Sequence, residues 1–254
     1  MLIKAKTLRG YTLESVNGEI GSVKEFYFDD CHWTIRYLVA DTGNWLTGKQ
    51  VLISPYALLS ENKKTNRIVV NLTKEQIENS PSLNSDMPVS RQFEEVYNGY
   101  YEWPTYWGGP YMWGSCPYLD VRDRENRCES TLGKKVWDSH LRSTHEVSGY
   151  HVNAVDGEIG HIEDFIIDDE TWAIRYLVID TRNWFPGKNV LVSPQWIERI
   201  SWNESNVFFK IPMHTIRQSP EYTDETLLNR DYEISLHKHY SRQGYWVDGN
   251  HPAN

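Results

Sequence analysis

Ile35-Arg-Tyr-Leu-Val39 returns unchanged as Ile174-Arg-Tyr-Leu-Val178, 139 residues further along the chain. The match extends without a gap over residues 11–55 and 150–194, where 25 of 45 positions are identical. An offset of this length is too long for one repeat of a solenoid. The chain is therefore a tandem duplication of a whole domain.

The duplication predicts the domain organisation. We expect two related domains at residues 1–81 and 141–220, joined by a helix and an aromatic, Pro/Gly-rich linker at residues 82–140. Residues 221–254 are expected to form a C-terminal helical segment and tail. Fainter matches at the same offset relate the segments after each domain, pairing Arg91, Glu94 and Tyr101 with Arg230, Glu233 and Tyr240.

Each domain has the pattern of a β protein. In the first, residues 19–28, 33–40, 50–53 and 67–71 are rich in β-branched and aromatic residues and are separated by turn signals, which predicts four strands. Short strands of this kind favour a small barrel or a sandwich. The predicted fold class is mainly β, with two tandem small antiparallel barrels, short helices and an ordered aromatic linker.

Two local patterns refine this prediction. Thr73-Lys-Glu-Gln76 has the form of a capping box, which predicts a short helix ended by Ser80-Pro81. Val23 and Phe26 have opposite parity in the first strand, so a bulge after Gly21 is expected to bring both onto the core side.

Composition narrows the class of protein. The chain has 254 residues with 26 Lys and Arg against 35 Asp and Glu, a net charge of -9, and it contains 11 Trp and 16 Tyr. Such a density of aromatic residues is untypical of a disordered chain. The acidic balance argues against a nucleic-acid partner, which requires a basic surface.

The compartment is expected to be the cytoplasm. No signal peptide or run of about 18 apolar residues is recognisable, so no transmembrane segment is predicted. Three cysteines, an odd number, favour a reducing environment.

The repeated motifs resemble the PRC-barrel family. They comprise a Gly-Glu-Ile-Gly turn (18–21 and 157–160), the Arg-Tyr-Leu-Val strand, an Asp-Thr loop ending in Trp (41–45 and 180–184) and a Gly-Lys-x-Val-Leu strand (48–55 and 187–194). The resemblance implies a barrel like the cytoplasmic domain of the photosynthetic reaction-centre H subunit and the C-terminal domain of a ribosome maturation factor. Those proteins use the barrel to dock on a larger assembly.

Asp41-Thr-Gly43 also has the form of an aspartic-protease loop, in which two carboxylates share a proton. The second copy reads Asp180-Thr-Arg182, and Arg replaces the glycine that the tight turn needs. We expect the two carboxylates to bond nearby backbone rather than to form a catalytic pair.

Other polar groups are interpreted as structural. Asp29-Asp30 and Asp168-Asp169 are expected in hairpin turns rather than cation sites. Cys31-His32 and His237-x-His239 lack partners at zinc spacing, so they are taken as surface or packing residues. No catalytic residue, metal site or cofactor is predicted.

The central strand supplies one candidate interface. Arg36 and Leu38 share a face, as do Arg175 and Leu177, and both faces of the strand are partly apolar. Equivalent faces of the two barrels are expected to meet as an internal pseudo-dimer. Each Arg is either an interface anchor or the partner of a structural ion pair.

The aromatic linker supplies the second candidate interface. Trp103, Trp107 and Trp113 are expected to remain partly exposed as anchors for a protein partner, while the neighbouring rings pack on the barrels. The sequence thus predicts a non-enzymatic protein-binding or assembly module whose partner is unknown. A hydrolase using Asp41 and Asp180, and an RNA- or ribosome-associated maturation factor, remain as alternatives.

Overall fold

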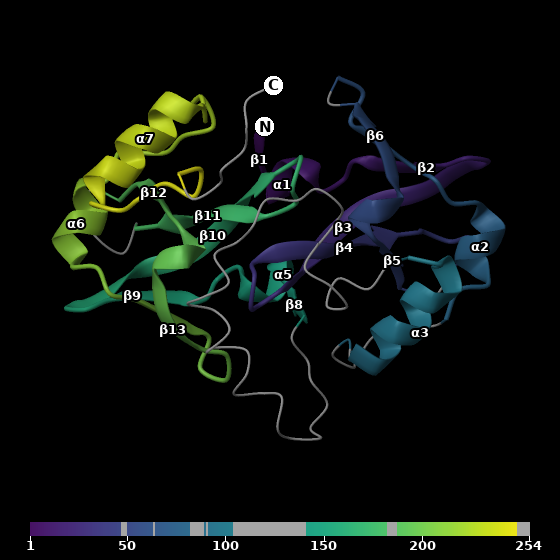
Figure 1. Cartoon of the computed structure of the whole chain (residues 1–254), viewed down its shortest axis with the longest axis horizontal. Coiled ribbons are helices and arrows are strands. Elements are labelled where there is room, and N and C mark those ends of the chain that lie inside the picture. The colour runs from purple at the N-terminus through teal and green to yellow at the C-terminus, as the bar shows by residue number, and fades with distance from the viewer. Residues whose placement is uncertain are drawn as a thin grey trace. The chain divides into compact units, whose positions relative to one another are not determined.

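A computed structural model describes residues 1–46, 50–62, 64–81, 89, 91–103, 141–181 and 187–247. The chain divides into two compact units. Of the described residues, the N-terminal barrel holds 5–103 and 141–144, and the C-terminal barrel holds 1–4 and 145–247 (Figure 1). The fold is mainly β with two tandem barrels, as expected from the sequence.

The N-terminal barrel is built on one seven-stranded sheet. Its strands follow the order β5-β4-β3-β2-β7-β6, and β8 pairs with β3. The strands are β2 (Thr12–Ser15), β3 (Gly18–Asp29), β4 (Thr34–Asp41), β5 (Val51–Ile53), β6 (Leu58–Asn62), β7 (Arg67–Val70) and β8 (Leu141–Ser143). The helices are α1 (Ala5–Leu8), η1 (Pro55–Ala57), α2 (Lys74–Glu78) and α3 (Arg91–Tyr101).

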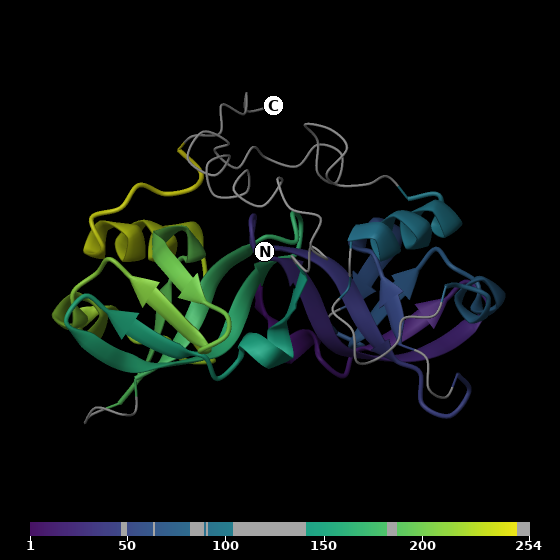
Figure 2. The same cartoon turned by 90° about the horizontal axis from the view of Figure 1, so that it is seen from below.

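The C-terminal barrel repeats this plan. Its order is β12-β11-β10-β9-β14-β13, and β1 pairs with β10. The strands are β1 (Leu2–Lys4), β9 (His151–Ala154), β10 (Gly157–Asp168), β11 (Ile174–Asp180), β12 (Asn189–Val192), β13 (Ile197–Ser201) and β14 (Asn206–Phe209). The helices are α5 (Thr144–Val147), η3 (Pro194–Trp196), α6 (Met213–Gln218) and α7 (Arg230–His239), the last drawn in yellow in Figure 2.

The barrels are not wholly antiparallel, which corrects the prediction. β2 pairs with β7 in parallel, and β9 pairs with β14 in the same way. In each repeat the last two strands form a hairpin, β6 with β7 and β13 with β14. The second strand of this hairpin, β7 or β14, lies beside β2 or β9 and runs in the same direction. Sequence alternation alone does not distinguish the two directions.

Three sequence predictions are confirmed. Every residue of β11 is buried, as are all of β4 except Asp41, so the central strand is covered on both sides. The register of β3 shifts between Val23 and Glu25, and this bulge turns both Val23 and Phe26 into the core. α2 begins with the capping box of Thr73 and Gln76.

The compact units do not follow the repeat boundaries at their first strands. β1 belongs in sequence to the first repeat, yet it pairs with β10 of the C-terminal barrel. β8 opens the second repeat and pairs with β3 of the N-terminal barrel. Each barrel is therefore completed by a strand from the other repeat.

A glycine in the repeated turn explains part of the motif. Gly21 and Gly160 have φ of +147° and +154°. A Cβ on either would overlap the carbonyl oxygen of Asp41 or Asp180, at the end of the neighbouring strand. Close packing of β3 on β4, and of β10 on β11, thus requires glycine at these positions.

Gly160→Ala tests this packing against a matched control. Gly149 also has positive φ, +97°, but a Cβ there meets nothing within 4 Å. We expect Gly149→Ala to lower the free energy of unfolding by about 1 kcal/mol, and Gly160→Ala to lower it by about 2 kcal/mol more, since backbone must move. Urea unfolding of both variants measures the difference. Equal losses would contradict the packing argument.

Candidate functional site

The central strand of each barrel carries a buried arginine at a bulge. The pairing of β3 with β4 passes from Tyr37 to Ile35 and skips Arg36. The pairing of β10 with β11 skips Arg175 in the same way. A bulge leaves one residue out of the ladder and re-aims its side chain. Arg36 is fully buried and Arg175 is 7% exposed.

In the N-terminal barrel, Arg36 is held by Asp29 at the end of β3. Its Nε donates to Asp29 Oδ2 at 2.6 Å, and the backbone N–H of His32 donates to Asp29 Oδ1 at 2.6 Å. Burial alone raises the pKa of Asp29, but the Arg36 charge and the His32 contacts outweigh it and hold the pKa well below its usual range.

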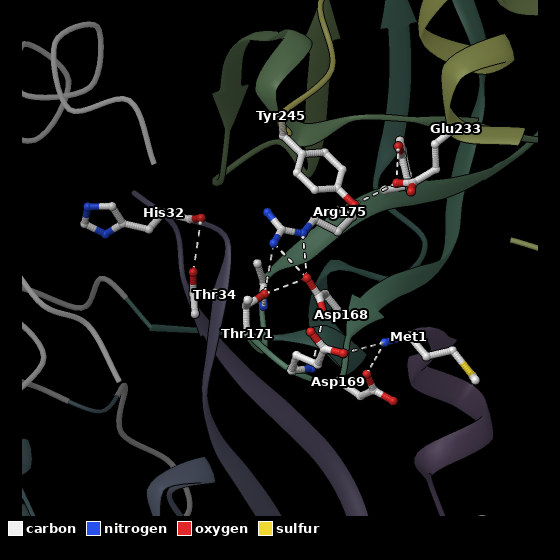
Figure 3. A network of polar contacts seen from close by, with 12 residues as sticks. Met1, His32, Thr34, Asp168, Asp169, Thr171, Arg175, Glu233 and Tyr245 are labelled. Atoms are coloured by element: carbon white, nitrogen blue, oxygen red, sulfur yellow. Dashed lines mark hydrogen bonds and ion pairs between the residues drawn. The ribbon is translucent and has the colours of Figure 1, made fainter. Parts of the chain in front are cut away.

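The C-terminal barrel has the equivalent pair with a larger network around it (Figure 3). Arg175 Nη2 donates to Asp168 Oδ2 at 2.7 Å and to Thr171 Oγ1 at 3.0 Å. The Arg175 guanidinium lies 4.1 Å from the centre of the Tyr245 ring. Burial raises the pKa of Asp168, but the charge and hydrogen bonds of Arg175 lower it overall.

Glu233 of α7 joins this network to the centre of β11. Its Oε1 accepts from the hydroxyls of Tyr176 and Tyr245, each at 2.8 Å. Its Oε2 lies 3.0 Å from Arg230 Nη1. Glu233 is 4% exposed, so these contacts replace its hydration shell. Burial and Glu233 raise the pKa of Tyr245 to about 12.

His237 lies one turn further along α7, inside an aromatic cluster. Its ring is within about 6 Å of the rings of Trp196, Tyr176 and Trp246. Nδ1 is 2.9 Å from the carbonyl oxygen of Gln243, and Nε2 is 3.1 Å from the Tyr176 hydroxyl. Nδ1 therefore carries a proton. Burial lowers the pKa of His237 below its ordinary value of 6.5.

The N-terminal barrel docks α3 through the same positions. Tyr37, the equivalent of Tyr176, donates to Asn98 Oδ1 at 3.1 Å, and Asn98 is the equivalent of His237. Burial and Glu94 raise the pKa of Tyr37. Tyr97 adds a contact to the edge strand, because its hydroxyl donates to the Leu52 carbonyl at 2.9 Å.

The central strand of each barrel thus contacts both a hairpin turn and a covering helix. The charged groups of both networks are engaged by other side chains of the same barrel. Within the described ranges, no group of three or more His, Cys, Asp or Glu residues is placed to hold a metal ion. Across the same ranges, every helix is too short or too polar to cross a lipid bilayer.

The two Asp-Thr loops have different environments. Asp41 is exposed, and its Oδ1 accepts from the Gly43 backbone N–H at 3.0 Å, as predicted. Asp180 is 1% exposed and lies 3.8 Å from His161 Nε2. Arg182 lies outside the described residues. The local bond of Asp41 is that of an Asx turn.

The acidic pairs are in hairpin turns, as predicted, and their first members hold the buried arginines. Arg36 and Arg175 were expected to be either interface anchors or partners of a structural ion pair, and the structure shows the ion pair. Leu38 and Leu177 are fully buried. The pseudo-dimer of the two barrels stays a prediction.

The aromatic linker is described only at its beginning. Trp103 is 9% exposed and stacks on Tyr101 with ring centres 4.3 Å apart, so it does not act as the exposed anchor that was expected. Ring stacking on α3 accounts for its burial. Trp107 and Trp113, like the rest of residues 104–140, lie outside the described residues.

Cys31 corrects another interpretation. It is disulfide-bonded, so it is not the plain surface or packing residue that was expected. Disulfides are rare in reducing compartments, so the number of cysteines no longer supports a cytoplasmic location. That location stays a prediction.

A family model of the PRC-barrel domain matches residues 2–77 and 142–208. The chain belongs to the PRC-barrel family. No curated protein matches the chain. The two matched segments coincide with the two copies of the repeat, so this PRC-barrel chain carries the domain twice.

Sequence reasoning missed the residues that dock α3 and α7. Glu94 and Glu233 appeared only as faint matches at the offset of 139. The available signal was a glutamate repeated in the helix that follows each barrel. A glutamate on the exposed surface of a helix needs no fixed partner, so its recurrence at one position indicates a specific contact. The central Tyr37 and Tyr176 were visible in the strand motif but had no assigned role.

Arg36→Met tests the ion pair directly. The change leaves Asp29 as a buried carboxylate without its guanidinium, so we expect a loss of about 3–5 kcal/mol in the free energy of unfolding. The double variant D29N/R36M should recover most of that loss, because neither charge remains. Denaturant unfolding measures both. A neutral Arg36→Met with impaired partner binding would instead favour the interface alternative.

His237→Asn tests the buried imidazole, with Asn98 as its natural counterpart. The lowered pKa means that folding disfavours protonation, so stability is present above pH 6.5 and is lost as pH falls below it. We expect the urea midpoint of the wild type to fall between about pH 7 and pH 5 more steeply than that of the variant. Asn98→His should add a similar slope. Parallel profiles of wild type and His237→Asn would contradict this.

Proposed function

We propose that this PRC-barrel chain is a non-enzymatic protein-binding module that assembles with a protein partner. The support comes from how the polar groups are used. In both barrels the buried acids and arginines hold α3 or α7 and the hairpin turn, and these are structural tasks. A binding role needs only a stable surface, which such networks supply.

The described surface that best suits a partner is the outer side of α3. Val96 is 62% exposed and Tyr100 is 40% exposed. Four residues apart on a helix, they share one face. Tyr100 is held in place because its hydroxyl donates to the Gln76 carbonyl at 2.9 Å. A fixed aromatic ring beside an aliphatic side chain is a typical core of a protein interface.

The anchoring of α3 makes this surface rigid. Tyr97, on the inner side, packs against Tyr37 and Phe93 and bonds to Leu52. Because the helix is ordered before binding, a partner loses less entropy on docking. The net charge of -9 favours a protein over RNA, and the environment of Asp41 gives the hydrolase alternative no support.

Val96→Asp is the test, with Val16→Asp as its control. Val16 belongs to the same barrel and is 57% exposed, but it lies in the turn between β2 and β3. We expect Val96→Asp to reduce recovery of the partner at least tenfold, because a charge is placed at the apolar centre of the interface. Val16→Asp should leave recovery unchanged. Affinity purification from the native cells, followed by quantitative mass spectrometry, measures both.

Two results would count against the proposal. One is a set of partners that both variants recover equally, which would place the interface elsewhere. The other is a turnover assay in which the purified chain acts on a peptide or ester library and loses that activity in Asp41→Asn.

A further inference from the structure

The exchanged first strands carry an inference that goes beyond the binding role of α3 and does not depend on it. β1 lies on β10 with Leu2 opposite Asp168 and Lys4 opposite Ile166. β8 lies on β3 with Leu141 opposite Asp29 and Ser143 opposite Tyr27. At the repeat offset these are the same positions, so both exchanges use one register.

The second aspartate of each acidic pair holds the incoming strand. Arg142 Nε of β8 donates to Asp30 Oδ2 at 3.0 Å. The amino group of Met1 contacts Asp169, the equivalent carboxylate. Thus the first aspartate of each pair binds the barrel's own arginine, and the second binds the strand that the other repeat donates.

Further contacts fix each donor strand. Ser143 Oγ bonds to Glu25 of β3. Lys4 contacts the Asp224 carboxylate, and its Nζ lies 5.0 Å from the centre of the Tyr222 ring. Each acceptor edge therefore offers backbone hydrogen bonds and acidic side chains to a short, partly basic strand.

Where the chain passes from one barrel to the other, each donor strand is followed directly by a helix, with no loop between them. β1 ends at Lys4 and α1 begins at Ala5, while β8 ends at Ser143 and α5 begins at Thr144. Ala5 and Thr144 are fully buried, and Thr144 Oγ1 accepts from the Phe26 backbone N–H at 3.2 Å. A short, packed hinge of this kind favours exchange over folding back.

The family match points to the same unit. Its two segments begin at residues 2 and 142, so the domain as a unit of sequence includes its first strand. In space that strand completes a different barrel. One PRC-barrel repeat thus carries both a donor strand and an acceptor edge that are mutually complementary.

We propose that these acceptor edges, on β3 at Tyr27–Asp29 and on β10 at Ile166–Asp168, also bind the donor strands of a second copy of the chain. The contacts of an exchanged strand are the same whether donor and acceptor belong to one chain or to two. Reciprocal exchange between two chains is isologous and closes as a dimer. The balance between monomer and dimer is set by protein concentration against the effective concentration within the chain.

A charge exchange at the contact of Arg142 with Asp30 tests the proposal on the full chain. Both side chains are only partly buried, 21% and 16% exposed. Asp30→Arg places two arginines together inside one chain, and Arg142→Asp places two aspartates together. A dimer of one chain of each variant has complementary charges at both contacts. The double variant D30R/R142D restores the contact within one chain and is the matched control.

The two single variants are unfolded together, refolded at several concentrations and examined by native mass spectrometry. We expect the mixed dimer to exceed each of the two like dimers at least fivefold, whereas random pairing of equal amounts gives a twofold excess over each. The double variant should be mainly monomeric. Mixtures that refold to monomers only, or to dimers in random proportion, would overturn the proposal.

Folding of the single variants gives a second readout. If neither folds alone, far-ultraviolet circular dichroism should show that mixing restores the β signal to the level of the double variant. A mixture that stays unfolded while the double variant folds would overturn the proposal as well.

Discussion

The buried Arg–Asp pair of each barrel is the interaction on which the rest of the structure depends. A guanidinium in the interior requires a carboxylate within hydrogen-bond distance. The bulge at Arg36 or Arg175 turns the side chain inward, and the hairpin that follows β3 or β10 brings Asp29 or Asp168 to meet it. The motif Ile-Arg-Tyr-Leu-Val can be repeated unchanged because the same geometry recurs.

That pair also determines what its neighbours do. With the first aspartate of the turn committed to the arginine, the second is left for the donated strand. The next residue after the arginine, Tyr37 or Tyr176, reaches the helix that covers the barrel. A single bulge therefore organises the turn, the exchanged strand and the covering helix.

The two copies solve one packing problem in different ways. In the C-terminal barrel, Trp196 of η3 packs on Tyr240 with ring centres 4.7 Å apart. The N-terminal barrel has Ala57 at that position, and Trp103 stacks on the equivalent Tyr101 instead. In the C-terminal barrel the indole comes from η3, which connects two strands. In the N-terminal barrel it comes from the residues just after α3. This explains why Trp103 is buried although it follows a helix in a segment rich in Pro and Gly.

Much of the fold was predictable from local patterns. Strand composition, the capping box and the parity of Val23 and Phe26 each have a local cause and were read correctly. The exchange of β1 and β8 was not predictable from the sequence. The two copies are so similar that a donor strand fits either barrel in the same register, so the sequence does not indicate which barrel it joins. The Glu233 network was missed for a related reason. Tyr176 and Glu233 are 57 residues apart, and only the fold brings them together.

The exchanged strands also have a consequence for the order of events during synthesis on the ribosome. β1 is made long before its partner strand, since Met1 contacts a carboxylate 168 residues later. The N-terminal barrel likewise cannot be completed before Ser143 is made, 118 residues after its partner Glu25. Long-range pairing of this kind slows folding and leaves strand edges open while the chain grows. The nascent first repeat must therefore spend the translation of more than a hundred residues with an open edge on β3.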